Sequence, residues 1–292
     1  MSIPYSRNPL YADLTEHVIP PTNGPNPIAP INFSDEFIDV MGYFNCLIQR
    51  SELSKRSLDI TLDVIRLNPA NYTAWHFRRR CLLHLKYDLR QELDDSRVLA
   101  RSNPKNYQVW YHRQALLDSI NDQHDELSFL SEMLHQDAKN YHVWTLRQWI
   151  LTRFTLEDSV WRNELEFLED LLISDIFNYS AWSHRRLVVK HLKIDFVQEC
   201  CYSLAKIKQV PTNESSWMYL KGLRVQAELP EEVMEYTRSL GNTNRFAALL
   251  LAEDCECRGE SSNAEMWFKV LASIDSIRKD FWLYEAERIK TL

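Results

Sequence analysis

Glycine is scarce in this sequence, and proline is scarce beyond the N-terminal end. Only 5 of the 292 residues are glycine, and seven of the 11 prolines fall within the first thirty positions. Both residue types interrupt helices, so little in the remaining sequence would end a helix early. We therefore predict an all-α fold.

Long apolar runs and targeting signals are also missing. No apolar stretch approaches the roughly 20 residues that cross a bilayer, and the N-terminus lacks the basic-then-apolar layout of a secretory signal. The six cysteines follow neither a disulfide framework nor zinc-finger spacing. We expect no membrane span and a cytoplasmic location.

Charge and motifs exclude further classes of function. The formal net charge of −7 argues against a general nucleic-acid binder. The sequence has no glycine-rich phosphate loop, no nucleophile elbow and no histidine pair with helical zinc spacing. We therefore expect the chain not to be an enzyme by itself, and any anionic ligand would need a local basic patch.

What the sequence does contain is an internal repeat. A tryptophan recurs every 34 to 38 residues, each four positions after an asparagine. The tryptophans are Trp75, Trp110, Trp144, Trp182 and Trp217, and the asparagines are Asn71, Asn106, Asn140, Asn178 and Asn213. Such a period is typical of stacked supersecondary units, each too small to bury its own apolar face.

Alignment on the tryptophans predicts a pair of antiparallel helices in each repeat. The positions seventeen and ten before the tryptophan are apolar throughout, and their spacing is close to two helical turns. In Asn68-Pro69 and Asn103-Pro104 a proline ends one helix, and the asparagine two positions later can cap the next. The longest spacing, before Trp182, predicts a loop insertion near residues 155–162.

We divide the chain into three parts. Residues 1–34 are predicted to be a proline-rich extended segment that adds little to the core. Residues 35–225 form the repeat array, which starts with a helix capped by Ser34. Residues 226–292 are predicted to close the array with further helices.

The repeated residues each allow two interpretations. Periodic tryptophans are usually core residues, although aromatic rings can also stack on ligands. The arginine that follows three positions later, as in Arg78 and Arg113, could bond carboxylates within the array or reach a partner subunit. Lys105, just before a capping asparagine, could be a solvated surface residue or could bind phosphate together with free helix-start amides.

The repeated motif resembles the α subunit shared by protein farnesyltransferase and protein geranylgeranyltransferase type I. The likeness rests on Asn-Tyr-Thr-Ala-Trp from Asn71, Pro-Lys-Asn-Tyr-Gln-Val-Trp from Pro104 and Asp-Ala-Lys-Asn-Tyr-His-Val-Trp from Asp137, and it returns at Ile277-Arg-Lys-Asp-Phe-Trp. The resemblance implies an α–α superhelix, a crescent of antiparallel helical hairpins around a β subunit. It also implies transfer of an isoprenoid from its diphosphate to the cysteine of a C-terminal C-a-a-X sequence.

Cofactors and site residues follow from the same resemblance. Zinc would be held by the β subunit, and magnesium would assist the farnesyl reaction. Lys105 matches the lysine that reaches the diphosphate, and Gln108 matches the glutamine that binds the terminal carboxylate of the protein substrate. The residues matching others that face the same cavity are Tyr107, Tyr141, His142 and, in the first repeat, Tyr72.

Two alternatives remain at this point. A non-catalytic tetratricopeptide-like scaffold has a similar period, but that signature includes a glycine and small residues at fixed places. The α subunit of the Rab geranylgeranyltransferase also repeats Asn-x-x-x-Trp, although it commonly carries additional domains.

Overall fold

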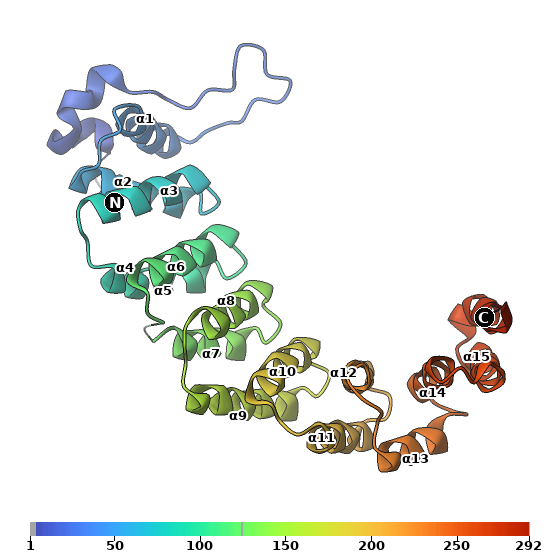
Figure 1. Ribbon diagram of the computed structural model, residues 1–292. Helices are drawn as coiled ribbons and strands as arrows, with labels where there is room; N and C mark the ends of the chain where they lie inside the picture. Colours follow the sequence, from blue (N-terminus) through green and yellow to red (C-terminus); the bar gives the residue numbers. More distant parts are fainter. Residues whose placement is uncertain (1–3, 124, 292) are drawn as a thin grey trace. The chain divides into compact units, whose positions relative to one another are not determined.

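The computed structural model describes residues 4–123 and 125–291 and divides into two compact bodies, one ending at Phe154 and one starting at Thr155 (Figure 1). Residues 1–3 of the predicted N-terminal segment, residue 124 of the array and residue 292 of the closing part lie outside this description. Helices and turns make up the described regular structure, as the glycine and proline distribution predicts. None of these helices is both long enough and apolar enough for a bilayer.

The first body contains an N-terminal segment, one helix and three repeats. Its elements are η1 (Tyr5–Arg7), η2 (Pro9–His17), α1 (Asp35–Gln49), α2 (Lys55–Leu67), α3 (Tyr72–His84), α4 (Leu89–Asp95), α5 (Arg97–Ser102), α6 (Tyr107–Ile120), α7 (Glu126–Gln136) and α8 (Tyr141–Arg153). Helix α2 packs on α3, α4 and α5 pack on α6, and α7 packs on α8. The tryptophan-bearing helices α3, α6 and α8 also pack on one another in sequence, as Figure 1 shows.

The second body continues with the same arrangement. Its elements are α9 (Asp158–Ser174), α10 (Tyr179–Leu192), α11 (Phe196–Gln209), α12 (Glu214–Arg224), α13 (Glu231–Leu240), α14 (Arg245–Cys257), α15 (Ser261–Ile274), η3 (Ser276–Arg278), α16 (Lys279–Arg288) and η4 (Ile289–Thr291). The pairs α9–α10, α11–α12 and α13–α14 form three more hairpins. A separate apolar cluster that includes Phe268 and Trp282 joins α14, α15 and α16.

The N-terminal segment differs from its predicted extended form in its first half, where residues 5–7 and 9–17 are helical, while residues 18–34 contain no helix. Asn8 caps η2 by accepting a hydrogen bond from the Leu10 amide, and Pro9 fits the first helical position because that position needs no N–H donor. Tyr11 and Leu14 are buried against the array, so the segment does contribute to the core. Gly42 of α1 permits this contact, since a Cβ there would lie only 2.6 Å from Val18.

The predicted loop insertion near residues 155–162 is also different in the structure. The connection between α8 and α9 is short, and α9 has 17 residues whereas α7 has 11. Trp161 is buried in α9, so its indole extends the apolar side of the helix toward the N-terminus. The extra residues therefore lengthen a helix, because one of them is an aromatic residue that packs in the core.

Candidate functional site

Each tryptophan-bearing helix begins at a turn that we call a repeat tip. The predicted asparagine caps are confirmed: the side-chain oxygens of Asn71, Asn106, Asn140, Asn178 and Asn213 all accept hydrogen bonds from amides in the first turn. A cap of this kind contributes about 1 kcal/mol to helix stability. The sequence thus fixes where the helices α3, α6, α8, α10 and α12 start.

The tryptophans lie behind the tips, and their interpretation as core residues is confirmed. All five are at most 5% exposed, and each indole Nε1–H donates to the carbonyl six residues earlier. They also pack across repeat boundaries, for example Trp75 on His112 and Trp182 on Tyr219. Since their ring faces are enclosed, these tryptophans do not form a ligand-stacking surface.

Some of the tip carbonyls accept a second hydrogen bond from the following repeat. The Pro104 carbonyl accepts from Trp110 Nε1 at 2.8 Å and from Asn140 Nδ2 at 3.0 Å. The Pro211 carbonyl likewise accepts from Trp217 and from Asn244. The capping asparagine therefore serves two purposes, because its oxygen starts its own helix while its amide fixes the preceding tip.

The arginines three positions after the tryptophans are buried inside the array. The guanidinium groups of Arg78, Arg113 and Arg185 bond Glu92, Glu126 and Glu199 of the next repeat. Arg147 donates to the Leu127 carbonyl and to Ser131. Of the two interpretations, bonding within the array is confirmed, since these four residues are at most 8% exposed.

Helices α6 and α8 bring most of the predicted site residues together. The imidazole of His142 packs edge-on against the rings of Tyr107, at 4.3 Å between centroids, and Tyr141, at 5.4 Å. The backbone of Lys105 also acts on this imidazole, since it raises the pKa of His142. Gln108 follows Tyr107 in the first turn of α6, where its amide donates to the cap Asn106 at 2.7 Å.

The tips present aromatic rings and exposed lysines at the surface, since Lys105 and Lys139 are both exposed. Tyr72, Tyr107, Tyr141 and Tyr179 are between 63% and 71% exposed. The Lys105 side chain is 82% exposed, with its Nζ 3.9 Å from Asp137 Oδ2. Tyr72 starts α3, one repeat away from Lys105, and is linked to this group through the packing of α3 on α6.

Electrostatics at the Lys105 tip favour a neutral imidazole beside a cation. Burial lowers the pKa of His142, and the Lys105 backbone opposes that shift only in part. The first amides of α6 lack partners within the helix and carry the positive end of the helix dipole. An exposed ammonium beside such amides is suited to an anion with several oxygens, such as a phosphate.

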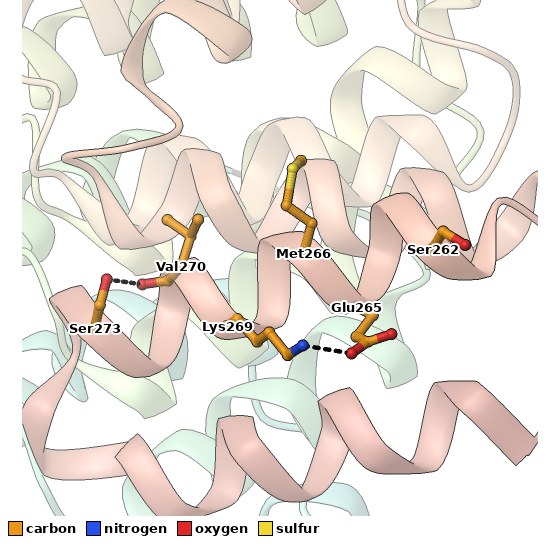
Figure 2. Close-up of a pocket in the computed structure, with 6 residues that line it drawn as sticks. All are labelled: Ser262, Glu265, Met266, Lys269, Val270 and Ser273. Atoms are coloured by element: carbon orange, nitrogen blue, oxygen red, sulfur yellow. Dashed lines mark hydrogen bonds and ion pairs between the residues drawn. The ribbon is translucent and has the colours of Figure 1, made fainter.

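Two recesses elsewhere in the described structure lack a comparable set of groups. One, of about 1070 Å³, lies between the N-terminal segment and the helices α1 and α2, and its lining includes four carboxylates and two arginines among mainly uncharged side chains. The other, of about 490 Å³, is lined by six side chains of α15 alone, where Lys269 pairs with Glu265 and Ser273 donates to the Val270 carbonyl (Figure 2). Within residues 4–123 and 125–291 no three His, Cys, Asp or Glu side chains cluster as a metal site.

Two features of the tips escaped the sequence analysis. Asp137 forms an ion pair with Lys105 although the two residues are 32 positions apart. The sequence analysis gave Asp137 no role. Asn244 caps α14 and bonds the Pro211 carbonyl, which makes α13–α14 a sixth repeat. Its signal was the spacing of 31 residues from Asn213, but Ala248 stands where the tryptophan would be.

Comparisons with known proteins agree with this architecture. The model of the protein prenyltransferase alpha subunit repeat matches residues 54–85, 89–120, 124–154 and 161–192. A chain of the solved structure described as Candida albicans protein geranylgeranyltransferase-I complexed with GGPP has a TM-score of 0.83 and 30% identity, covering 94% of this chain and 98% of that one. The fold therefore defines a helical-hairpin repeat protein of the α–α superhelix class.

Sequence relatives carry the comparison further. The Candida albicans protein farnesyltransferase/geranylgeranyltransferase type-1 subunit alpha is 31% identical over 284 residues, which cover 91% of this chain and 93% of the relative. The Pisum sativum protein of the same name is 47% identical over 90 residues, and this match spans 26% of its length. The chain belongs to the protein prenyltransferase alpha-subunit family, as the repeated motif indicated.

Proposed function

We propose that this chain is the α subunit of a heterodimeric protein prenyltransferase, active only together with a β subunit. The heterodimer would transfer a farnesyl or geranylgeranyl group from its diphosphate to the cysteine of a C-terminal C-a-a-X sequence. The observation that carries the proposal is the Lys105 tip, where a lysine with an 82% exposed side chain immediately precedes Asn106, the cap of α6, and His142 of the next repeat packs on Tyr107. The names of the relatives support the same function.

Lys105 supplies the main catalytic contribution of this chain in the proposed reaction. The cysteine sulfur attacks the first carbon of the isoprenoid, the bond from that carbon to the diphosphate oxygen breaks, and the electron pair leaves with the diphosphate. The ammonium of Lys105 stabilises the negative charge that accumulates on those oxygens. Such a group acts on the transition state because the charge grows as the bond breaks.

Metal chemistry is assigned to the partner. Zinc bound by the β subunit would hold the cysteine as a thiolate, and magnesium would help the diphosphate to depart in the farnesyl reaction. The described residues of this chain contain no cluster of metal ligands. The chain's own contribution is assigned to the tip surface. On this surface Tyr72, Tyr107, Tyr141 and His142 would contact the substrates, and Gln108 would bind the terminal carboxylate of the protein substrate.

The first test concerns the partner. We expect the chain purified alone to transfer no isoprenoid, whereas co-expression with a protein prenyltransferase β subunit gives a zinc-containing heterodimer that does. Isoprenoid transfer to a fluorescent C-a-a-X peptide and metal analysis of the purified complex measure both points. The β subunit alone serves as the control, and transfer by the isolated α chain would contradict the proposal.

The second test concerns the terminal carboxylate of the protein substrate. Gln108→Ala in the heterodimer should raise the KM for a C-a-a-X peptide by about tenfold with little change for the isoprenoid, because one hydrogen bond to a charged group is lost. The matched control is Thr73→Ala, at the equivalent position of the first repeat. A peptide with an amidated C-terminus should bind both variants and the unchanged protein equally weakly; a defect limited to the isoprenoid would rule out this role.

A further inference from the structure

The third repeat contacts the tip of the second repeat at three points. Asn140 donates to the Pro104 carbonyl at 3.0 Å, His142 packs on Tyr107, and the Asp137 carboxylate lies 3.9 Å from the Lys105 ammonium. The first contact fixes the backbone just before Lys105. Of these three contacts, the one with Asp137 is made by the end of the Lys105 side chain, so Asp137 bears on where the ammonium lies.

We propose that Asp137 is a positioning residue for Lys105: its carboxylate holds the ammonium at the tip before an anion arrives and is its counter-ion after the anion has left. This inference rests on the proposed function of Lys105. A lysine has a long flexible side chain, and pairing restricts its conformations in advance of substrate binding. The negative charge of Asp137 also opposes tight binding of a free diphosphate product, because like charges repel.

The backbone around Asp137 makes this role testable. Asp137 Oδ1 accepts a hydrogen bond from the Lys139 amide at 3.2 Å and so shapes its own turn. Asn68 occupies the equivalent position of the first repeat and forms the same contact with the Ala70 amide at 3.1 Å. Asparagine therefore supports this turn, and Asp137→Asn removes the charge while the backbone geometry is retained.

A matched control exists at the opposite ends of the same two helices. Asp118 near the end of α6 pairs with Arg153 at the end of α8, at 2.9 Å. Both aspartates form exposed ion pairs between the second and third repeats, with side chains 41% and 55% exposed. Asp118→Asn therefore reproduces the loss of a surface ion pair without touching the tip.

The experiment uses the α–β heterodimer and compares Asp137→Asn, Asp118→Asn and Lys105→Ala. We expect Asp137→Asn to lower the single-turnover rate by about three- to fivefold, the range of a partly exposed ion pair, and to strengthen inhibition by inorganic pyrophosphate by a similar factor. Asp118→Asn should change neither quantity. In the Lys105→Ala background, Asp137→Asn should have no further effect on the rate, since the group that it positions is gone.

Inhibition by pyrophosphate separates a positioning role of Asp137 from a merely structural one. If Asp137→Asn only distorted the tip, pyrophosphate would bind more weakly. Unchanged or weaker pyrophosphate inhibition in Asp137→Asn, or an undiminished effect without Lys105, would overturn the inference. Neither result affects the proposed function, which fails if the unchanged heterodimer transfers no isoprenoid or if the isolated α chain transfers it.

Discussion

Replacing Arg113 with methionine should destabilise the chain by about 3–5 kcal/mol, the range measured when one partner of a buried ion pair is removed. Arg113 is fully buried, and its Nε and Nη2 donate to Glu126, which is also fully buried. Its Nη1 donates to the Leu93 carbonyl and to Ser96, both at 2.7 Å. The substitution leaves the buried Glu126 carboxylate without its guanidinium partner and removes one of the donors to the Leu93 carbonyl, which keeps the hydrogen bond from Ser96.

Urea unfolding followed by tryptophan fluorescence measures this effect as a lower midpoint. The control is Arg101→Met, because Arg101 pairs with Glu132 in the same bidentate way at 2.9 Å but is exposed. An exposed ion pair contributes at most about 1 kcal/mol, so the urea midpoint of Arg101→Met should differ little from that of the unchanged chain. Adding Glu126→Leu to Arg113→Met should recover part of the loss, since the orphaned charge is removed. Equal midpoints for the two single variants would show that burial does not determine the strength of this pair.

The repeat pattern predicted much of the fold because the residues that define it act locally. An asparagine caps the helix that starts next to it, and an indole bonds a carbonyl six positions away. These short-range rules located α3, α6, α8, α10 and α12 from sequence alone. The prolines Pro69 and Pro104, which stand before two of these tips, supplied the same information about where the preceding helices end.

The parts of the fold that differ depend on packing between distant residues. Tyr11 and Leu14 are buried only because α1 presents Gly42 and a surface that accepts the N-terminal segment. The predicted loop near Trp161 is helical in the structure, because the Trp161 side chain packs in the core from the first turn of α9. The sixth repeat was overlooked because Ala248 replaces the tryptophan, although Asn244 keeps both functions of the capping asparagine.

In the candidate site too, the residues identified from the sequence differ from those that only contacts between distant positions reveal. The resemblance supplied Lys105, Tyr107, Gln108, Tyr141, His142 and Tyr72, and the structure gathers most of them through contacts of His142. The sequence could not assign Asp137, since its contact with Lys105 crosses a repeat boundary. The variants Gln108→Ala, Asp137→Asn and Lys105→Ala test the proposed roles of Gln108, Asp137 and Lys105.

The larger functional effect is expected for Lys105→Ala in the heterodimer. Its single-turnover rate should fall by roughly 100-fold, the effect of removing one donor to a developing negative charge. The affinity for the isoprenoid diphosphate should change far less, because the bound diphosphate already has other contacts and only the additional charge of the transition state is left unsupported. Rapid-quench measurement of the rate and equilibrium titration of the isoprenoid separate the two quantities.

Two further variants separate the effect of the position of this lysine on the rate from the effect of its charge. Lys139→Ala changes the residue at the equivalent position of the third repeat, and it should reduce the rate much less if the contribution belongs to the second tip alone. Lys105→Arg keeps the charge but places it on a larger planar group, so we expect a rate between those of Lys105→Ala and the unchanged enzyme. If the Lys105→Ala heterodimer keeps its single-turnover rate, this lysine does not stabilise the departing diphosphate. That result would leave the tips with binding roles only, because an exposed ammonium that does not accelerate bond breaking contributes nothing to the transition state.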